Sequence, residues 1–337
     1  MGYPAAEYRS HPPRGCSGRL AATRRWPELT LTLLLACPWA QAAPFAWITN
    51  QGSHDVSVLD LASGKQVATV PVGQAPAGVV AASARGQVFV ANAGSNDVSV
   101  LDMRTHRELA RFAAGQGAVG LDAGANGNRL FVSDWYGAQL RVFDMPEQRE
   151  IARVPLGPAP AGVAALPDGS QAWVAERDDN RVALVDVASA RVLARVSVGQ
   201  HPFSLLLDAP RQRLYALNVQ SDNLSVIDTE RREVVATLPT GKAPYGAALA
   251  DGGRLLYVTN QHADSVSVFD AESLQLLRTL PGFGYPEGIA AHGANVYVVN
   301  WMDDAVSVLD ARSGALLSTI AVGRNPRGFG AFIGTPP

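Results

Sequence analysis

Short stretches in which apolar and polar residues alternate recur along the chain at a nearly constant spacing. One such stretch ends at positions 50, 92, 134, 176, 218, 260 and 300, and reads AWITN in its first copy and LYVTN in its sixth. The step from copy to copy is 42 residues five times and then 40. β-Branched and aromatic residues with a period of two predict half-buried strands rather than helices.

Two further features follow the same rhythm. A second predicted strand ends in Asp at positions 60, 102, 144, 186, 228, 270 and 310, and a V-A-T-V-type strand follows it. A turn that contains proline comes next, at Pro76, Pro160, Pro202, Pro244, Pro286 and Pro326, with Ala118 in its place in the second repeat. Each unit therefore has four strands: A follows the proline, B is the LYVTN-like stretch, C ends in Asp and D comes last. No stretch after residue 42 has the hydrophobic periodicity of a helix.

A four-stranded unit of about 42 residues cannot bury both of its faces alone, so the units must stack around a common axis. Residues 46–333 hold seven units, which predicts an all-β fold: a seven-bladed β-propeller of four-stranded antiparallel blades. The first unit begins directly at strand B, and residues 328–333 supply a candidate strand A for it. We expect this C-terminal strand to pair with residues 46–50 and close the ring, because an open sheet edge invites aggregation.

Three features of the repeats resemble those of the YVTN-repeat β-propeller family. They are the LYVTN of residues 256–260, the repeated VSVLD strands, and the Gly-x-x-Pro-x-Gly turn of residues 73–78. The resemblance covers essentially all of the chain after the leader, and it implies an exported bacterial or archaeal propeller. It implies little about activity, because the recurring residues are those of the scaffold.

The N-terminus has the features of an export signal. Arg24 and Arg25 precede an apolar run at residues 29–36, and an Ala-Gln-Ala sequence that signal peptidase would accept ends at residue 42. The apolar run is too short to span a bilayer, so no transmembrane segment is expected. We therefore divide the chain into a leader, residues 1–42, and one propeller domain, residues 43–337, and expect a periplasmic or secreted protein.

Both cysteines of the chain, Cys16 and Cys37, lie in this leader. The propeller itself therefore has no disulfide, no thiolate metal ligand and no cysteine nucleophile. Cys37 also ends a Leu-Leu-Ala-Cys sequence that resembles a lipobox, so a lipid anchor at Cys37 is the alternative to a soluble exported form.

The charge of the chain argues against nucleic-acid binding. Its composition is 47% hydrophobic and 17% charged, as in globular proteins. Without the five arginines and two glutamates of residues 1–42, 23 basic and 28 acidic residues remain, a net charge of −5. Such a body has no bulk attraction for nucleic acid or for an anionic membrane.

The position just after each turn proline predicts a binding site. Strand A lines the channel of a propeller, so this position should lie near the channel mouth, on the face where the D–A and B–C loops emerge. Read around the ring it is Ala77, Val119, Ala161, Phe203, Tyr245, Glu287 and Arg327. Aromatic residues beside a charge pair are typical of a contact surface. The alternative is that the two rings only fill the channel while Glu287 pairs with Arg327.

Residues of neighbouring loops extend this candidate site. Trp135 and Trp301 follow strand B, and we expect them as contacts at the rim, unless they only pack over neighbouring blades. His201 and His262 should lie on the same face of adjacent blades, where they could contact a ligand or, less simply, share a metal. Asp134 and Glu176 replace the usual Asn at the end of strand B, and we expect them to hold the B–C turn.

These observations favour a non-catalytic interaction module over an enzyme. No Gly-x-Ser-x-Gly sequence, no metal-binding His spacing and no phosphate loop is present, so we assign no catalytic residue, metal or cofactor. The expected ligand is a protein, a peptide or a small molecule, and the protein is expected to be a monomer. A metal-assisted lyase or lactonase, or a quinoprotein accessory, is the first alternative, and a structural envelope module is the second.

Overall fold

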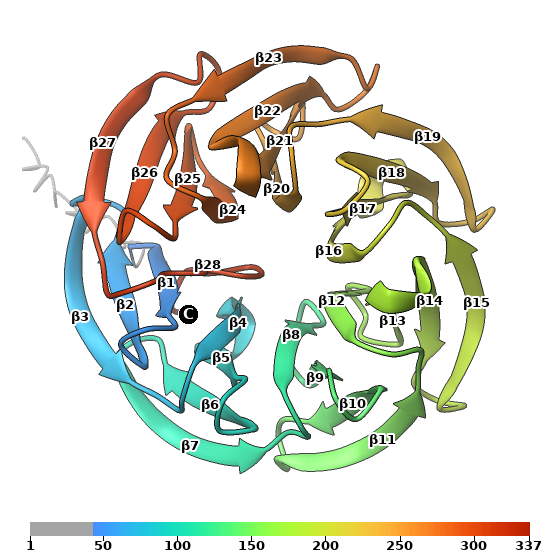
Figure 1. Ribbon diagram of the computed structural model, residues 1–337. Coiled ribbons are helices and arrows are strands. Elements are labelled where there is room, and N and C mark those ends of the chain that lie inside the picture. The colour runs from blue at the N-terminus through green and yellow to red at the C-terminus, as the bar shows by residue number, and fades with distance from the viewer. Residues whose placement is uncertain (1–42) are drawn as a thin grey trace, which may run out of the picture. The chain divides into compact units, whose positions relative to one another are not determined.

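The computed structural model describes residues 43–337, and the predicted leader with Cys16 and Cys37 lies outside the described part. The described chain forms seven four-stranded antiparallel sheets arranged as blades around a central axis (Figure 1). The predicted seven-bladed β-propeller is confirmed. Between residues 43 and 337, no helix has the length and apolar character needed to cross a bilayer.

Strands A and B form the inner half of each blade. The innermost strands, A, are β4 (Pro76–Ala82), β8 (Ala118–Ala123), β12 (Pro160–Ala165), β16 (Pro202–Asp208), β20 (Pro244–Ala250) and β24 (Pro286–His292). Strands B are β1 (Phe45–Asn50), β5 (Gln87–Asn92), β9 (Arg129–Asp134), β13 (Gln171–Glu176), β17 (Arg213–Asn218), β21 (Leu255–Asn260) and β25 (Asn295–Asn300).

Strands C and D form the outer half. Strands C are β2 (Asp55–Asp60), β6 (Asp97–Asp102), β10 (Gln139–Asp144), β14 (Arg181–Asp186), β18 (Asn223–Asp228), β22 (Ser265–Asp270) and β26 (Ala305–Asp310). Strands D are β3 (Lys65–Pro71), β7 (Arg107–Ala113), β11 (Arg149–Pro155), β15 (Arg191–Ser197), β19 (Glu233–Pro239), β23 (Leu276–Pro281) and β27 (Leu316–Ala321). Single 3₁₀ turns lie at η1 (Ser83–Arg85), η2 (Arg177–Asp179), η3 (Ala209–Arg211) and η4 (Gln261–Ala263).

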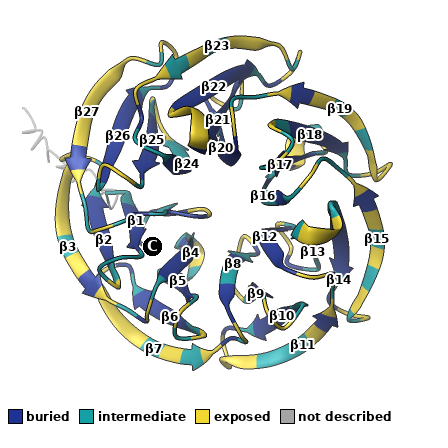
Figure 2. Ribbon diagram, viewed as in Figure 1, coloured by how far each residue is buried: buried dark blue, intermediate teal, exposed yellow. Residues whose placement is uncertain are grey.

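The hydrophobic core lies between the blades. Strands B and C are buried along most of their length, whereas strands D are largely exposed at the circumference (Figure 2). Large side chains of strand B, such as Trp47, Phe89 and Trp173, are fully buried where one blade packs on the next. Each blade therefore depends on its neighbours for burial, as expected for a radial repeat.

The repeated Asn at the end of strand B forms a buried rung to strand C. In the first blade the Asn50 side-chain amide donates to the Ser57 hydroxyl at 2.9 Å, and the same bond recurs in four other blades with lengths of 2.8–3.0 Å. In the two exceptional blades a carboxylate takes over. Asp134 accepts the backbone N–H groups of Gln116 and Gly137, and Glu176 accepts that of Gly157. Asp134 thus holds its B–C turn through Gly137, as the sequence predicts, whereas the backbone group that Glu176 holds belongs to the D–A loop.

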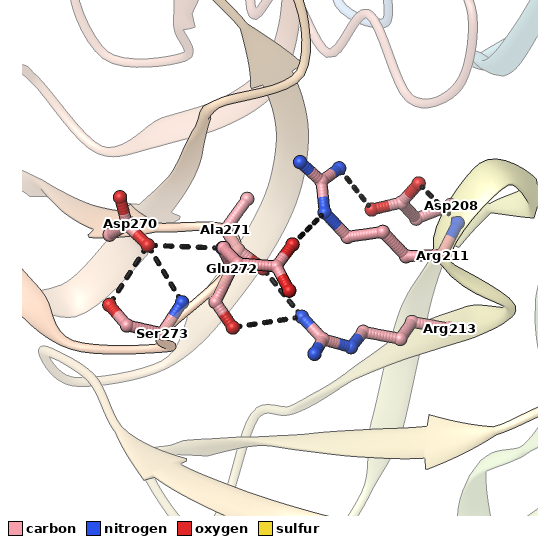
Figure 3. A network of polar contacts seen from close by, with 7 residues as sticks. All are labelled: Asp208, Arg211, Arg213, Asp270, Ala271, Glu272 and Ser273. Atoms are coloured by element: carbon pink, nitrogen blue, oxygen red, sulfur yellow. Dashed lines mark hydrogen bonds and ion pairs between the residues drawn. The ribbon is translucent and has the colours of Figure 1, made fainter.

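Polar contacts also join adjacent blades at their outer loops. Asp208 pairs with Arg211 at 3.0 Å, and the same guanidinium reaches Glu272 of the next blade at 2.9 Å (Figure 3). Arg213 donates to the backbone carbonyl of Ala271 at 2.6 Å in the same network (Figure 3). This network lies on the side of the A–B and C–D loops, away from the predicted binding face.

The C-terminus closes the ring, but with less regular pairing than predicted. The closing strand β28 (Ile333–Gly334) pairs with Phe45 and Ala46, and the residues before it make single backbone bonds on both sides. Phe329 and Ala331 accept N–H groups from β4, while Phe332 accepts the N–H of Trp47. The predicted six-residue strand is interrupted because Gly328 and Gly330 have φ values of 55° and 121°, which a strand does not allow.

Candidate functional site

The D–A and B–C loops meet at one end of the channel through backbone hydrogen bonds. The Trp135 N–H donates to the Gly117 carbonyl at 3.0 Å, and that of Trp301 donates to Tyr285 at 3.2 Å. The residue before each turn proline has a positive φ, for example 52° at His201 and 56° at Tyr285. This bend aims the following strand A along the channel and leaves the loop side chains around its mouth.

A pocket of about 520 Å³ lies at this mouth. Seven of its lining residues are equivalent, since each directly follows the last residue of a strand B: Gln51, Ala93, Trp135, Arg177, Val219, Gln261 and Trp301. Every blade thus contributes one loop residue to the wall. Three of these residues are aromatic or cationic, namely Trp135, Arg177 and Trp301, and the other four are small apolar or amide side chains.

Most of the predicted site residues come together in this pocket. Phe203, Tyr245, Glu287 and Arg327 all line it, together with the two tryptophans Trp135 and Trp301. His201 and His262, which the sequence also nominates, are absent from the lining.

Aromatic rings form the floor of the pocket. The ring of Phe203 lies 4.8 Å from that of Tyr245 and 5.1 Å from that of Phe329, and Tyr245 lies 6.0 Å from Phe329 (centroid distances). Trp135 extends this layer, with its ring 6.1 Å from Phe203. Phe329 comes from the closing segment and lines a second pocket deeper in the channel. The layer therefore separates two pockets. Phe203 and Tyr245 thus also fill the channel, which is the alternative role that the sequence left open for them.

Beside the aromatic floor lies a buried ion pair. The Arg327 Nε donates to Glu287 Oε2 at 2.7 Å, and its Nη2 donates to Oε1 at 3.3 Å and to the Tyr245 hydroxyl. Gln261 donates its Nε2 to the same Glu287 Oε1 at 2.8 Å. Both carboxylate oxygens are thus engaged. The pairing of Glu287 with Arg327, the alternative weighed from the sequence, is present.

Burial shapes the ionisation of this pair. Burial raises the pKa of Glu287, and the charge of Arg327 opposes that shift. Burial alone would lower the pKa of Arg327, but its contacts with Tyr245 and Glu287 outweigh this and raise it. Because the guanidinium stays charged and lies 2.7 Å from the carboxylate, the ionised form of Glu287 is favoured. The pair is a fixed, preorganised dipole rather than a free acid or base.

The rim of the pocket is aromatic and partly exposed. The guanidinium of Arg177 lies over the ring of Trp135 at 5.6 Å, and the neighbouring Tyr136 is 76% exposed. On the opposite side, the rings of Tyr285 and Trp301 are 5.5 Å apart. Exposed rings on a rigid rim offer a large contact area at little cost in conformational entropy.

The two predicted histidines have separate surroundings outside the pocket. His262 lies beside Tyr285, with its Nε2 3.2 Å from the tyrosine hydroxyl, and so supports the rim. Burial lowers the pKa of His201, and the nearby charge of Arg177 lowers it further. In the described part of the chain, no three His, Cys, Asp or Glu side chains lie close enough together to hold a metal ion.

The cations of the pocket bear on the quinoprotein alternative, because they decide whether a quinone cofactor could bind there. A quinone cofactor that carries several carboxylates would need guanidinium or ammonium groups free to receive them. Arg327 is paired with Glu287, and Arg177 is paired with Asp178. The residues of the pocket do not fit such a group.

Three residues of the pocket region have no place in the sequence-based site. Gln261 and Tyr285 line the pocket, and Phe329 lies beneath it, whereas the B–C loop residues Tyr136 and Arg177 lie at the expected face and line the pocket too. A comparison of equivalent loop positions would have identified Gln261, because the residue after strand B reaches the pocket in every blade. Phe329 has no such signal, since the closing segment is not a copy of the repeat.

The sequence profile of the family described as outer membrane protein assembly factor BamB matches residues 52–318. The chain belongs to this BamB family. Membership confirms a β-propeller family, which is the coarser part of the resemblance stated from the repeats. No curated protein matches the chain.

Solved structures similar to this BamB-family chain share its fold. Hydrazine synthase of Kuenenia stuttgartiensis is 18% identical with a TM-score of 0.67, over 74% of this chain and 87% of that one. A functionally unknown protein from Desulfotomaculum acetoxidans DSM 771 is 14% identical with a TM-score of 0.74, over 87% and 99%. At these identities the similarity concerns the propeller architecture alone.

Proposed function

We propose that this protein is a non-catalytic interaction module that binds a segment of a partner protein in the pocket at the D–A/B–C face. The observation that carries the proposal is the convergence of Trp135, Phe203, Tyr245 and Trp301 with the Glu287–Arg327 pair in one preformed pocket. These residues come from five different blades, so their proximity depends on the complete ring.

The chemistry of the pocket favours a protein segment as the ligand. Tryptophan, tyrosine and arginine are the side chains in which binding energy at protein interfaces concentrates. The rim adds exposed groups around that centre, notably Tyr136 and Met302, which are 76% and 63% exposed. A partner's apolar side chain would enter the pocket while its backbone lies across the rim.

The description of the family supports the same class of partner. It names an assembly factor of outer membrane proteins, which acts on other proteins in the bacterial envelope. For this chain we infer an exported location in the periplasm, with residues 1–42 as the cleaved leader. We also infer from the LYVTN-like strands that its blades are of the YVTN type.

The internal bonding of the pocket argues for binding rather than catalysis. Glu287, its one buried carboxylate, accepts hydrogen bonds from Arg327 and Gln261 on both oxygens. Taking up a proton would break its pair with Arg327 at 2.7 Å, so Glu287 is poorly suited to act as a general base. The same pairing suits a fixed dipole that orients a bound partner.

Site-specific cross-linking can test this proposal in cells. A photo-cross-linking residue at position 136 should capture envelope proteins, whereas the same residue at position 317, on the exposed outer strand β27, should not. The captured peptides define the partner segment, which is then synthesised and titrated against the purified propeller.

Matched variants test whether the pocket is responsible for binding the partner segment. Replacing Arg177 and Trp301 together with Ala should weaken binding of that peptide by about 10-fold or more. Arg254→Ala, which changes an arginine exposed elsewhere on the surface, is the control and should leave binding unchanged. Equal capture at positions 136 and 317, or unchanged affinity of a folded double variant, would overturn the proposal.

A further inference from the structure

The channel holds a second pocket, of about 500 Å³, on the far side of the aromatic layer from the proposed partner site. The inner strands β8, β12, β16, β20 and β24 form most of its wall, and residues 329–331 of the closing segment and three A–B loop residues form the rest. The wall is almost entirely backbone and apolar side chains. Asp122 is the one ionisable side chain that lines it, and Ser204 adds a hydroxyl.

Asp122 stands out from its equivalents in the ring. Five other inner strands carry apolar residues at this position: Val80, Ala164, Leu206, Ala248 and Ala290. The fold is thus built five times without a carboxylate here. A charged group at one position of an apolar ring therefore calls for an explanation beyond the scaffold.

The contacts of Asp122 leave its charge uncompensated. Its Oδ1 accepts the N–H of Ala123 at 2.8 Å, and its Oδ2 accepts that of Ala165 on the next blade at 2.8 Å. It forms no ion pair with any residue from 43 to 337, and no other charged side chain faces it from β8, β12 or the rest of the pocket wall. Burial raises the pKa of Asp122 to about 6, while the two N–H groups oppose this shift. At neutral pH a negative charge therefore borders an apolar cavity without a countercharge.

We propose that this second pocket binds a small organic ammonium ion, with Asp122 as its counterion and the apolar wall around its hydrocarbon part. Each carboxylate oxygen has lone pairs beyond the one used by the backbone, so it can accept from an ammonium group. A divalent metal ion would need several oxygen ligands, and a single carboxylate is too few. A hydrocarbon body matches the alanine and leucine side chains of the wall, which a hydrated ion would not.

The competing explanation is purely structural. Asp122 joins β8 to β12 by accepting the Ala165 N–H, and it could serve only to satisfy that group. The same backbone position on β4 is satisfied differently, since the Ala81 N–H donates to the Ala331 carbonyl of the closing segment. Under this explanation the carboxylate matters for stability but has no ligand.

Calorimetric titration separates the two explanations. The probes are cyclohexylammonium and the uncharged cyclohexanol, titrated at pH 7.5 into the full propeller, into Asp122→Asn and into Asp168→Asn. Asp168 is an exposed turn residue that bonds only within its own turn, so its variant is the matched control. We expect saturable binding of the ammonium probe to the wild type and to Asp168→Asn, and binding weaker by about 10-fold or more to Asp122→Asn, because a charge-assisted bond is lost.

The pH profile of the wild type gives a readout that needs no variant. Cyclohexylammonium remains charged at acidic pH, so its affinity should fall by about 10-fold per pH unit below pH 6, as Asp122 becomes protonated. No saturable binding by the wild type, equal binding of the ammonium and the alcohol, or unchanged binding by Asp122→Asn would each overturn the proposal. The proposed partner site lies at the other end of the channel, so cross-linking there is independent of this result.

Discussion

At the residue scale, the departures from the repeat are the informative positions. Scaffold residues recur, as in the Asn-to-Ser rung, whereas Phe203, Tyr245, Glu287 and Arg327 occupy one equivalent position with four different side chains. The structure shows why three of these side chains differ: the guanidinium of Arg327 donates to both the carboxylate of Glu287 and the hydroxyl of Tyr245. A residue in this group therefore cannot be replaced without affecting its partners.

The buried ion pair leads to the first prediction. Glu287→Gln should lower the free energy of unfolding by about 3–5 kcal/mol, because it leaves the charge of Arg327 buried without an anion. The double variant Glu287→Gln with Arg327→Met should recover part of that loss. Urea denaturation measures both. The exposed pair of Glu108 and Arg111 is the control, where Glu108→Gln should cost about 0–1 kcal/mol. Equal losses for the two glutamates would contradict a buried pair.

Asp122 leads to a prediction about pH. Its pKa is about 6 in the folded protein and 3.8 when unperturbed, so between these values the folded state binds more protons than the unfolded state. Stability therefore falls as pH rises through this window, by about 3 kcal/mol at most, and the loss remains above pH 6. Urea denaturation of the wild type and Asp122→Asn from pH 3.5 to 8 isolates this contribution. A difference between the two proteins that does not change with pH would refute it.

At the element scale, the loops and the closing segment decide what the repeated strands cannot. Each B–C turn is tied to a D–A turn by backbone bonds, so the residue after strand B points into the same pocket in every blade. The closing segment is shared by two blades, through Phe332 to β1 and through Phe329 and Ala331 to β4. It thus acts as a seam between the first and second blades.

The seam leads to a prediction about one side chain. Phe332 is fully buried in the cluster that joins the first blade to its neighbours, so Phe332→Ala should destabilise the protein by about 3–5 kcal/mol. Leu317→Ala on the outer strand β27, where the leucine is 57% exposed, should change stability by less than about 0.5 kcal/mol. Chemical denaturation of the two variants provides the comparison, and a small effect at Phe332 would mean that the seam carries little of the stability.

At the scale of the whole molecule, the propeller is a ring with two separate pockets along one channel. Phe203, Tyr245 and Phe329 form the layer between them. The outer pocket opens among loops with exposed aromatic residues, which suits a protein segment. The inner pocket is lined by apolar side chains with a single carboxylate. Two ligands of different class can therefore be tested independently.

Export is the prediction that concerns the whole chain. If residues 1–42 are a cleaved leader, the N-terminus of the protein recovered from the periplasm should be Ala43, because the Ala-Gln-Ala sequence ends at residue 42. Intact mass and N-terminal sequencing of that fraction give the answer. A membrane-bound form that begins with a lipid-modified Cys37 would support the anchored alternative instead.

The sequence by itself determined the architecture and much of the partner site. Repeats of about 42 residues with a period of two admit few folds other than a propeller, because each unit must bury its faces against copies of itself. Equivalent positions then map directly onto one ring, so Phe203, Tyr245, Glu287 and Arg327 could be grouped from their place in the repeat alone.

Tertiary structure decided what does not repeat. The closing segment is unlike any blade, so the position of Phe329 under Phe203 and the division of the channel appear only after the ring is closed. Asp122 has no neighbour in sequence that would indicate an uncompensated charge, since its surroundings come from other blades and the closing segment. Whether a charge is paired or isolated depends on distances across the channel, and only the closed ring sets those distances.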